Sequence, residues 1–228
     1  SDFGNVTFEK TVNGAQNLTV NTAGDSIFNG AVGNDTALAS VTTDEPGTTA
    51  INGGSVATTG AQTYNEPVLL GTSTTLTSTG AGNIGFGGVV NGAQALAVNT
   101  AGVTTFGAAV GGTTPLTSIT TDGGGSTAIN GATVASSGAQ IYGDAVVLGG
   151  ATLFSTAGSA LAFAGTLTAP AAVTVNGAGA VMVSQGIGNL TLVLATPATA
   201  SVNTSGNLSM QGGVDQTITL GNSSAGGA

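Results

Sequence analysis

The string NGAQNLTVNTAG occupies residues 13–24, and nearly the same string, NGAQALAVNTAG, returns at residues 91–102. The offset in numbering is 91 − 13 = 78, and the register holds without a gap from about residue 4 to residue 158. The same offset relates TAING at residues 49–53 to residues 127–131, and GAQ-x-Y at residues 60–64 to residues 138–142. A repeat of this kind is typical of chains that stack one structural unit on the next.

A shorter spacing lies inside the 78-residue unit. An apolar position recurs in steps of 20 or 38 along the numbering, at Leu18, Leu38, Leu76, Leu96 and Leu116. A step of 38 is two steps of 19, so we expect two units of four rungs each across residues 4–158, with rungs of about 19–20 residues. The pattern continues in weaker form, which predicts degenerate rungs over residues 159–228 and one continuous solenoid over residues 1–228.

The local sequence favours short strands and tight turns. Apolar runs such as residues 17–20 and 68–70 are bounded by Gly, Asn, Asp and Thr, as in short β-strands. The chain has 40 glycines and no amphipathic helical pattern. These features predict an all-β chain folded as a parallel β-helix, whose stacked rungs share a thin apolar core. Antiparallel sandwich domains remain the alternative, because Asn-Gly turns also favour hairpins.

The charge composition disfavours several classes of function. The chain has one Lys and no Arg, His or Cys, against ten acids, for a net charge of −9. Without His and Cys, common metal sites and catalytic triads cannot form, so we expect no enzyme activity and no cofactor. A single cation makes nucleic acid an unsuitable partner. No apolar run reaches the roughly 18 residues that a membrane-spanning helix needs, so we expect no membrane insertion as a helix.

Matched acids are the remaining candidates for a chemical site. Asp44 matches Asp122, and Glu66 matches Asp144. Asp44 and Asp122 are the candidate calcium ligands, although the calcium-binding nonapeptide motif is absent. Catalytic carboxylates like those of pectin-cleaving β-helices would have to cluster, but only Asp44 and Glu45 are adjacent, and adjacent strand residues point to opposite faces. The pattern therefore favours solvated turn acids over a catalytic pair or a metal site.

Other matched residues are predicted to be structural. Asn13 with Asn91, and Asn52 with Asn130, are expected at rung corners as candidates for stacked Asn ladders. Phe28 and Phe106 are expected to fill the core, and Tyr64 and Tyr142 to lie at corners with their hydroxyls outward. The Thr-rich stretch at residues 72–79 is interpreted as an ordinary β-branched strand, with a flat ice-binding row as the alternative.

The repeat units NGAQ-x-L-x-VNTAG, TTD-x-x-G-x-TAING and GAQ-x-Y resemble the long repeat regions of filamentous-haemagglutinin-like bacterial adhesins, across about residues 4–165. The resemblance implies a right-handed parallel β-helix, secretion to the bacterial cell surface, and a role in adhesion or biofilm formation. Glycans on host or other surfaces are then the expected external partners. The chain is far shorter than such adhesins, so we expect an excised segment or a small relative.

Two non-enzymatic functions follow from these expectations. The first is an extracellular structural and adhesive module of a bacterial adhesin, with neighbouring repeats of the same chain as partners. The second is a self-assembling subunit that stacks head to tail into an extracellular fibre, because open solenoid ends expose unpaired strand edges. The resemblance favours the adhesin, while the low charge and the lack of recognisable capping segments favour the fibre.

Overall fold

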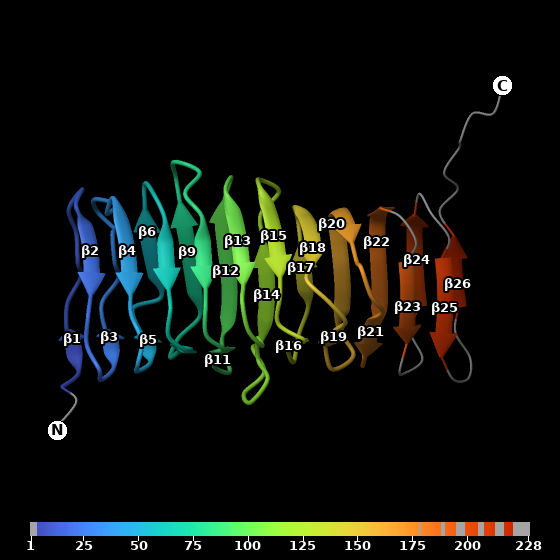
Figure 1. Cartoon of the computed structure of the whole chain (residues 1–228), viewed down its shortest axis with the longest axis horizontal. Coiled ribbons are helices and arrows are strands. Elements are labelled where there is room, and N and C mark those ends of the chain that lie inside the picture. Colours follow the sequence, from blue (N-terminus) through green and yellow to red (C-terminus); the bar gives the residue numbers. More distant parts are fainter. Residues whose placement is uncertain are drawn as a thin grey trace.

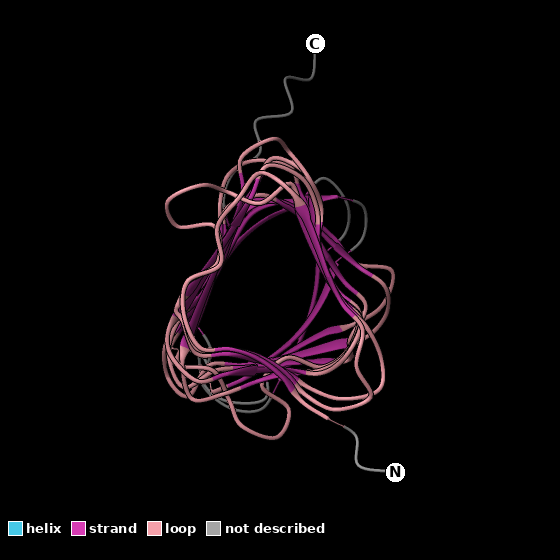
Figure 2. Cartoon of the chain, turned by 90° about the vertical axis from the view of Figure 1, so that its left-hand side faces the viewer, coloured by secondary structure: helices cyan, strands magenta, loops and turns pink. Residues whose placement is uncertain are grey.

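The computed structural model describes residues 4–177, 179–187, 190–194, 199–204, 208–212 and 217–220. All of the described regular elements are β-strands, and they pair in parallel. The strands stack along one axis (Figure 1), and seen from one end they form three walls (Figure 2). The predicted parallel β-solenoid is therefore confirmed, and the antiparallel sandwich is wrong.

Each turn of the chain visits three faces in the same order. The first face contains two five-stranded sheets, joined through bridges from Val110 to Val90 and Val134. Its strands are β1 (Val6–Phe8), β3 (Ser26–Phe28), β5 (Thr49–Ile51), β8 (Val68–Leu70), β11 (Val90–Asn91), β16 (Thr133–Ala135), β19 (Thr152–Ser155), β21 (Val173–Asn176), β23 (Leu190–Leu194) and β25 (Leu208–Gly212).

The second and third faces belong to one sheet, because strands of both faces pair with β20 (Ala160–Thr168) in the later turns. The second face holds β6 (Ser55–Thr58), β9 (Thr74–Ser78), β12 (Ala95–Thr100), β14 (Ser118–Thr121) and β17 (Gln140–Tyr142), preceded by bridges between Val12, Val32 and Val56. The third face holds β2 (Asn17–Val20), β4 (Ser40–Thr43), β7 (Gln62–Tyr64), β10 (Ile84–Phe86), β13 (Val103–Phe106), β15 (Ser126–Ile129) and β18 (Ala145–Leu148).

Longer strands cover the corner between these two faces in the later turns. β20 (Ala160–Thr168) pairs with β17 through its first half and with β18 through its second half. β22 (Ala180–Ile187), β24 (Thr199–Thr204) and β26 (Thr217–Leu220) extend the stack beyond β20.

The 78-residue repeat does not contain a whole number of turns. Residues 6–78 of the first unit place four strand positions on each of the first and second faces and three on the third. These eleven positions make three and two-thirds turns. The second unit therefore begins one face out of step: β1 lies on the first face, whereas its counterpart β10 lies on the third.

The expectation of four equal rungs in each unit is thus wrong in detail. Residues that pair across successive turns are separated by different lengths of chain. The separation is 217 − 199 = 18 residues between Thr199 and Thr217, and 40 − 17 = 23 residues between Asn17 and Ser40. The leucine spacing predicted the wrong register because it aligned residues that do not pair. Leu76 pairs with Val98, which lies two positions beyond Leu96. Turn length varies because corners and loops of different size join strands of nearly constant geometry.

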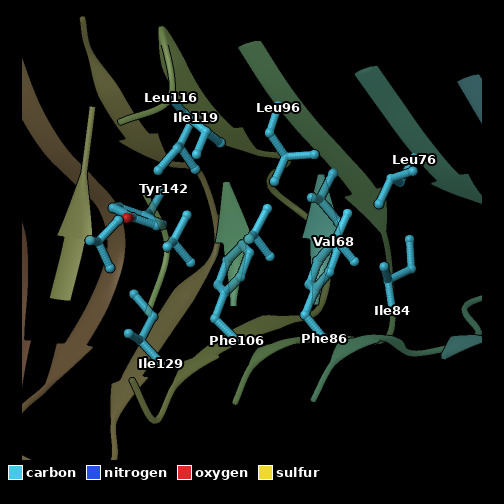
Figure 3. Close-up of a cluster of buried hydrophobic side chains, with 14 of the residues drawn as sticks. Val68, Leu76, Ile84, Phe86, Leu96, Phe106, Leu116, Ile119, Ile129 and Tyr142 are labelled. Carbon is cyan, nitrogen blue, oxygen red and sulfur yellow. The ribbon is translucent and has the colours of Figure 1, made fainter. Parts of the chain in front are cut away.

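The core consists of rows of inward side chains that run along the solenoid axis. Phe86 stacks between Tyr64 and Phe106, with ring centroids 5.5 and 5.3 Å apart. Figure 3 shows Phe86 and Phe106 side by side in the core. Phe28 stacks on Phe8 at 5.1 Å. Phe28 and Phe106 are each 1% exposed, so their predicted core role is confirmed. In-register strands place matched inward positions directly above one another, which converts a sequence repeat into a continuous core.

Two matched loops leave this regular path. Residues 33–37 and 111–115 each open with a glycine in the left-handed region, Gly33 at φ 70° and Gly111 at φ 67°. A Cβ on Gly33 would lie 2.1 Å from the Ala57 carbonyl oxygen, so no other residue fits there without a shift of the backbone. Sequence divergence between the two loops is tolerated because their tips are exposed.

Candidate functional site

Charged side chains occur only at corners and loops in the described structure. None of the strands contains Asp, Glu or Lys. Because outward strand positions carry mainly Thr, Ser, Ala, Asn and Val, the three faces are uncharged. Four outward apolar side chains, Leu69, Ile141, Val147 and Met182, are 42–51% exposed.

The longest row of outward hydroxyls runs along the third face. Thr19 pairs with Thr42 and Thr42 with Thr63, followed by Gly85 and Thr105. This row follows from strand alternation, because the inward neighbours Val20, Thr43 and Tyr64 are buried.

The Thr-rich stretch 72–79 forms β9 on the second face. Thr75 and Thr77 point outward there, but they pair with Ala97 and Asn99 of the next turn. The stretch is therefore an ordinary strand rather than part of a continuous threonine row.

The candidate calcium ligands brace the turn that precedes them. Asp44 Oδ1 accepts a hydrogen bond from the Thr22 backbone N–H at 3.0 Å, and Asp122 Oδ1 accepts the matched bond from Thr100 at 3.2 Å. No group of three or more Asp, Glu, His or Cys side chains converges in the part of the chain that the structure describes. Both acids thus act as corner acceptors that join adjacent turns.

The other matched acids are buried, each under a corner of the solenoid. Glu66 lies between β7 and β8, and its Oε1 accepts a 2.6 Å hydrogen bond from the Thr49 hydroxyl, which is itself 2.8 Å from the Thr43 hydroxyl. Burial raises the pKa of the Glu66 carboxyl; the hydroxyls of Thr49 and Ser26 oppose that shift, and the charges of Asp44 and Asp25 add to it. Among the described residues, Glu66 Oε2 and Ser26 Oγ are buried without a hydrogen-bond partner.

Asp144 occupies the matched place between β17 and β18, but both of its carboxylate oxygens have hydrogen-bond partners. Thr121 and Thr127 each lie 2.9 Å from Oδ1, and Thr127 also lies 2.8 Å from Oδ2. Burial raises the pKa of Asp144, the two threonine hydroxyls oppose the shift, and the charge of Asp122 adds to it. The shorter carboxylate therefore sits in a fuller set of donors than Glu66 does.

A buried glutamine supports each tyrosine inside the core. Gln62 donates to the carbonyl oxygens of Val56 and Thr77, at 3.1 and 3.0 Å, and accepts a 3.0 Å hydrogen bond from the Tyr64 hydroxyl. Gln140 repeats this arrangement with Tyr142.

The prediction that Tyr64 and Tyr142 lie at corners with outward hydroxyls is therefore wrong. Both side chains are fully buried, and burial raises the pKa of each hydroxyl. The sequence did carry the signal, since the GAQ-x-Y pattern places Gln and Tyr two residues apart and thus on the same side of a strand.

The matched asparagines lie at corners, in two different roles. Asn13 Oδ1 accepts hydrogen bonds from the backbone N–H groups of Asp35 and Thr36 in the 33–37 loop. Asn91 repeats this with Thr113 and Thr114 in the 111–115 loop.

The second asparagine pair behaves as a ladder only in the first unit. Asn52 donates to Asn29 Oδ1 at 2.8 Å, and Asn29 donates to Glu9 Oε2 at 3.0 Å. Asn130, the counterpart of Asn52, lacks this ladder because Gly107 stands at the position matched to Asn29.

These arrangements brace the solenoid by joining each turn to the next. The described part of the chain also has no helix that could span a membrane. Comparisons with known proteins found no family model, no curated protein and no solved structure that matches this chain.

Proposed function

We propose that the chain is a non-enzymatic structural module of an extracellular bacterial surface adhesin, in which a stiff solenoid presents uncharged adhesive faces. The observation that carries the proposal is the distribution of charge, because the described strands contain no charged side chain. Flat faces of Thr, Ser, Ala and Asn suit a partner bound through many weak hydrogen bonds, such as a surface glycan. The resemblance to filamentous-haemagglutinin-like repeats supports the same proposal.

The core supports a role as a spacer. Ring stacks and in-register hydrogen-bond ladders connect each turn to the next, so the solenoid resists bending through many small contacts. With strands about 4.8 Å apart, the described turns make a rod roughly 50 Å long. Such a rod holds a binding face away from the point of attachment.

Adhesion is tested by applying labelled protein to glycan-coated and bare surfaces. We expect binding to at least one glycan surface, and a several-fold loss in the variant Thr19→Ala/Thr42→Ala/Thr63→Ala, which removes the hydroxyl row of the third face. The matched control is Thr75→Ala/Thr77→Ala on the second face. Binding that is absent from all surfaces, or lost equally in both variants, would contradict adhesion through this face.

A second candidate, a subunit of an extracellular fibre, is favoured by the first described turn. Its apolar residues Val6, Phe8, Val12 and Leu18 pack against the core but are only partly buried. Their counterparts Ile84, Phe86, Val90 and Leu96 are all at most 1% exposed, because β7, β8 and β9 cover them. Another turn stacked on this edge would bury these apolar side chains. That turn could come from an adjoining segment of a longer chain or from a second copy.

Negative-stain electron microscopy over a concentration series separates the two candidates. The adhesin module predicts separate rods of roughly 50 Å at all concentrations. The fibre predicts long filaments whose number rises with concentration, and such filaments would displace the simple spacer as the better proposal.

A further inference from the structure

The Glu66 corner combines a buried acid with an incomplete set of donors. Glu66 is 0% exposed, and the charges that act on its carboxyl, those of Asp44 and Asp25, are both negative. The chain's single basic side chain, Lys10, is exposed in the turn after β1. An ionised carboxylate in this place would thus be buried without a compensating cation, which is costly.

Three hydroxyls lie near this carboxyl, but only one of them, that of Thr49, makes a hydrogen bond to it, and Ser26 Oγ has no partner. Thr49 carries one hydroxyl proton, which it can give either to Glu66 Oε1 or to Thr43 Oγ1. If the Thr49 hydroxyl donates to Glu66, the Thr43 hydroxyl can donate to Thr49. The two hydroxyls then form a chain that gives the carboxyl one hydrogen bond. Glu66 Oε2 remains without a partner and faces the backbone at Gly47, where an added Cβ would lie 2.8 Å away.

The Asp144 corner is an internal control for this count. Thr121 and Thr127 are the repeat counterparts of Thr43 and Thr49, but both contact the carboxylate directly. They act in parallel and supply two donors across both oxygens. Val103 replaces Asp25 at the matched position, which removes one neighbouring negative charge from the second corner.

We propose that the Glu66 corner is a proton-binding site, in which the buried carboxyl takes up a solvent proton on Oε2 and is held as the neutral acid that closes the corner between the third and first faces. Protonation removes the uncompensated charge and turns Oε2 into a donor beside the buried Ser26 hydroxyl. Loss of the proton leaves a buried anion that accepts one hydrogen bond, from Thr49, and the corner then loosens.

The groups that face Glu66 fix the sign of the pH dependence. Ser26 and Asp25 come from β3 and its approach, Thr43 and Asp44 from the end of β4, and Thr49 from β5. Tyr64 on β7 faces Gln62 and stays neutral, since burial raises its pKa.

The pKa of Glu66 is raised in the folded chain. At pH values between the ordinary glutamate pKa and this raised pKa, folding is therefore accompanied by the uptake of a proton. Protonated Glu66 contributes its whole stabilisation at pH values below the ordinary glutamate pKa. This contribution falls as the pH rises from that pKa to the raised pKa of Glu66, and the equilibrium constant of unfolding rises by up to about tenfold per pH unit.

The proton is detected directly by nuclear magnetic resonance of protein labelled with ¹³C only in glutamate. The sequence has three glutamates, so three side-chain carboxyl signals are expected, from Glu9, Glu45 and Glu66. One signal should titrate distinctly above the ordinary glutamate range, and the variant Glu66→Gln should remove that signal. A Glu66 signal, identified by its loss in Glu66→Gln, that titrates in the ordinary range would overturn the proposal.

The same variant tests the effect on folding. Glu66→Gln keeps the shape of the neutral acid. We expect it to flatten the decline of the unfolding midpoint as the pH rises above the ordinary glutamate pKa, whereas the exposed control Glu45→Gln should leave that decline unchanged. An undiminished decline in Glu66→Gln would overturn the proposal. So would a Glu66 signal that moves on addition of calcium chloride but not with pH, since it would assign a cation to the corner.

Discussion

The two 78-residue units share their sequence pattern but differ in their surroundings, because the second is rotated by one face relative to the first. Among the described residues, Phe8 stacks on Phe28 alone, whereas its counterpart Phe86 stacks on rings from the turn before and the turn after. Whether a side chain points inward is set locally by strand alternation. What lies above and below it is set by the number of strands that precede it, which the repeat length alone does not reveal.

The largest expected difference between the units concerns the matched phenylalanines. Phe86→Ala should lower the free energy of unfolding by about 3–5 kcal/mol, because it empties a fully buried place between two rings. Phe8→Ala should cost distinctly less, since Phe8 is only partly buried. Urea unfolding followed by circular dichroism measures both, and equal losses would contradict the account of an uncovered first turn.

The buried glutamines should behave alike in spite of the rotation. Gln62→Leu and Gln140→Leu each leave buried carbonyl oxygens and a tyrosine hydroxyl without a partner, at a cost of about 2–3 kcal/mol. The exposed Gln16→Leu is the control. If the two buried variants differ in unfolding free energy by much more than their error, the two networks are not equivalent.

The buried acids should respond to amide replacement with opposite signs. At pH values above its raised pKa, Glu66→Gln should stabilise the chain by about 1 kcal/mol, because it removes a buried anion that accepts one hydrogen bond, from Thr49. Asp144→Asn should destabilise it by a similar amount, because an amide nitrogen then faces hydroxyls that had donated to a carboxylate. Chemical denaturation of both variants is the measurement, and shifts of the same sign would remove the proposed distinction between the corners.

The smallest expected effects concern the loop-bracing asparagines. Asn13→Ala and Asn91→Ala should each cost about 0.5–1 kcal/mol, because each loses acceptors for two loop amides. Hydrogen exchange should speed up at Thr36 in the first variant and at Thr114 in the second, each without change in the other loop. Faster exchange in both loops at once would point to a general loosening instead.

The sequence predicted the fold class and much of the core, because both depend on local alternation and on the repeat. Phe28 and Phe106 lie where the pattern placed them. The register could not be predicted from leucine spacing, since turns of unequal length shift each leucine relative to its neighbour above.

Only part of the arrangement around the two buried acids could be predicted from the sequence. The match between Glu66 and Asp144 marked a recurring acid, but their burial depends on which threonines the corner brings together. In the first corner Thr43 reaches only Thr49, and in the second Thr121 reaches the acid itself. The two acids differ by one methylene, but which threonine reaches the carboxyl depends on the path of the chain through the corner, and the residue types alone do not specify that path.

The most direct test of the central claim, that each unit spans three and two-thirds turns, is a spin-label distance along the third face. The chain has no cysteine, so the variant Thr19→Cys/Val147→Cys can be labelled at two defined sites. The registers place these residues in one outward row, six strand spacings apart, which predicts about 29 Å between backbones. A distance that departs from this by more than one strand spacing, after allowance for the labels, would contradict the register and the rotation between units.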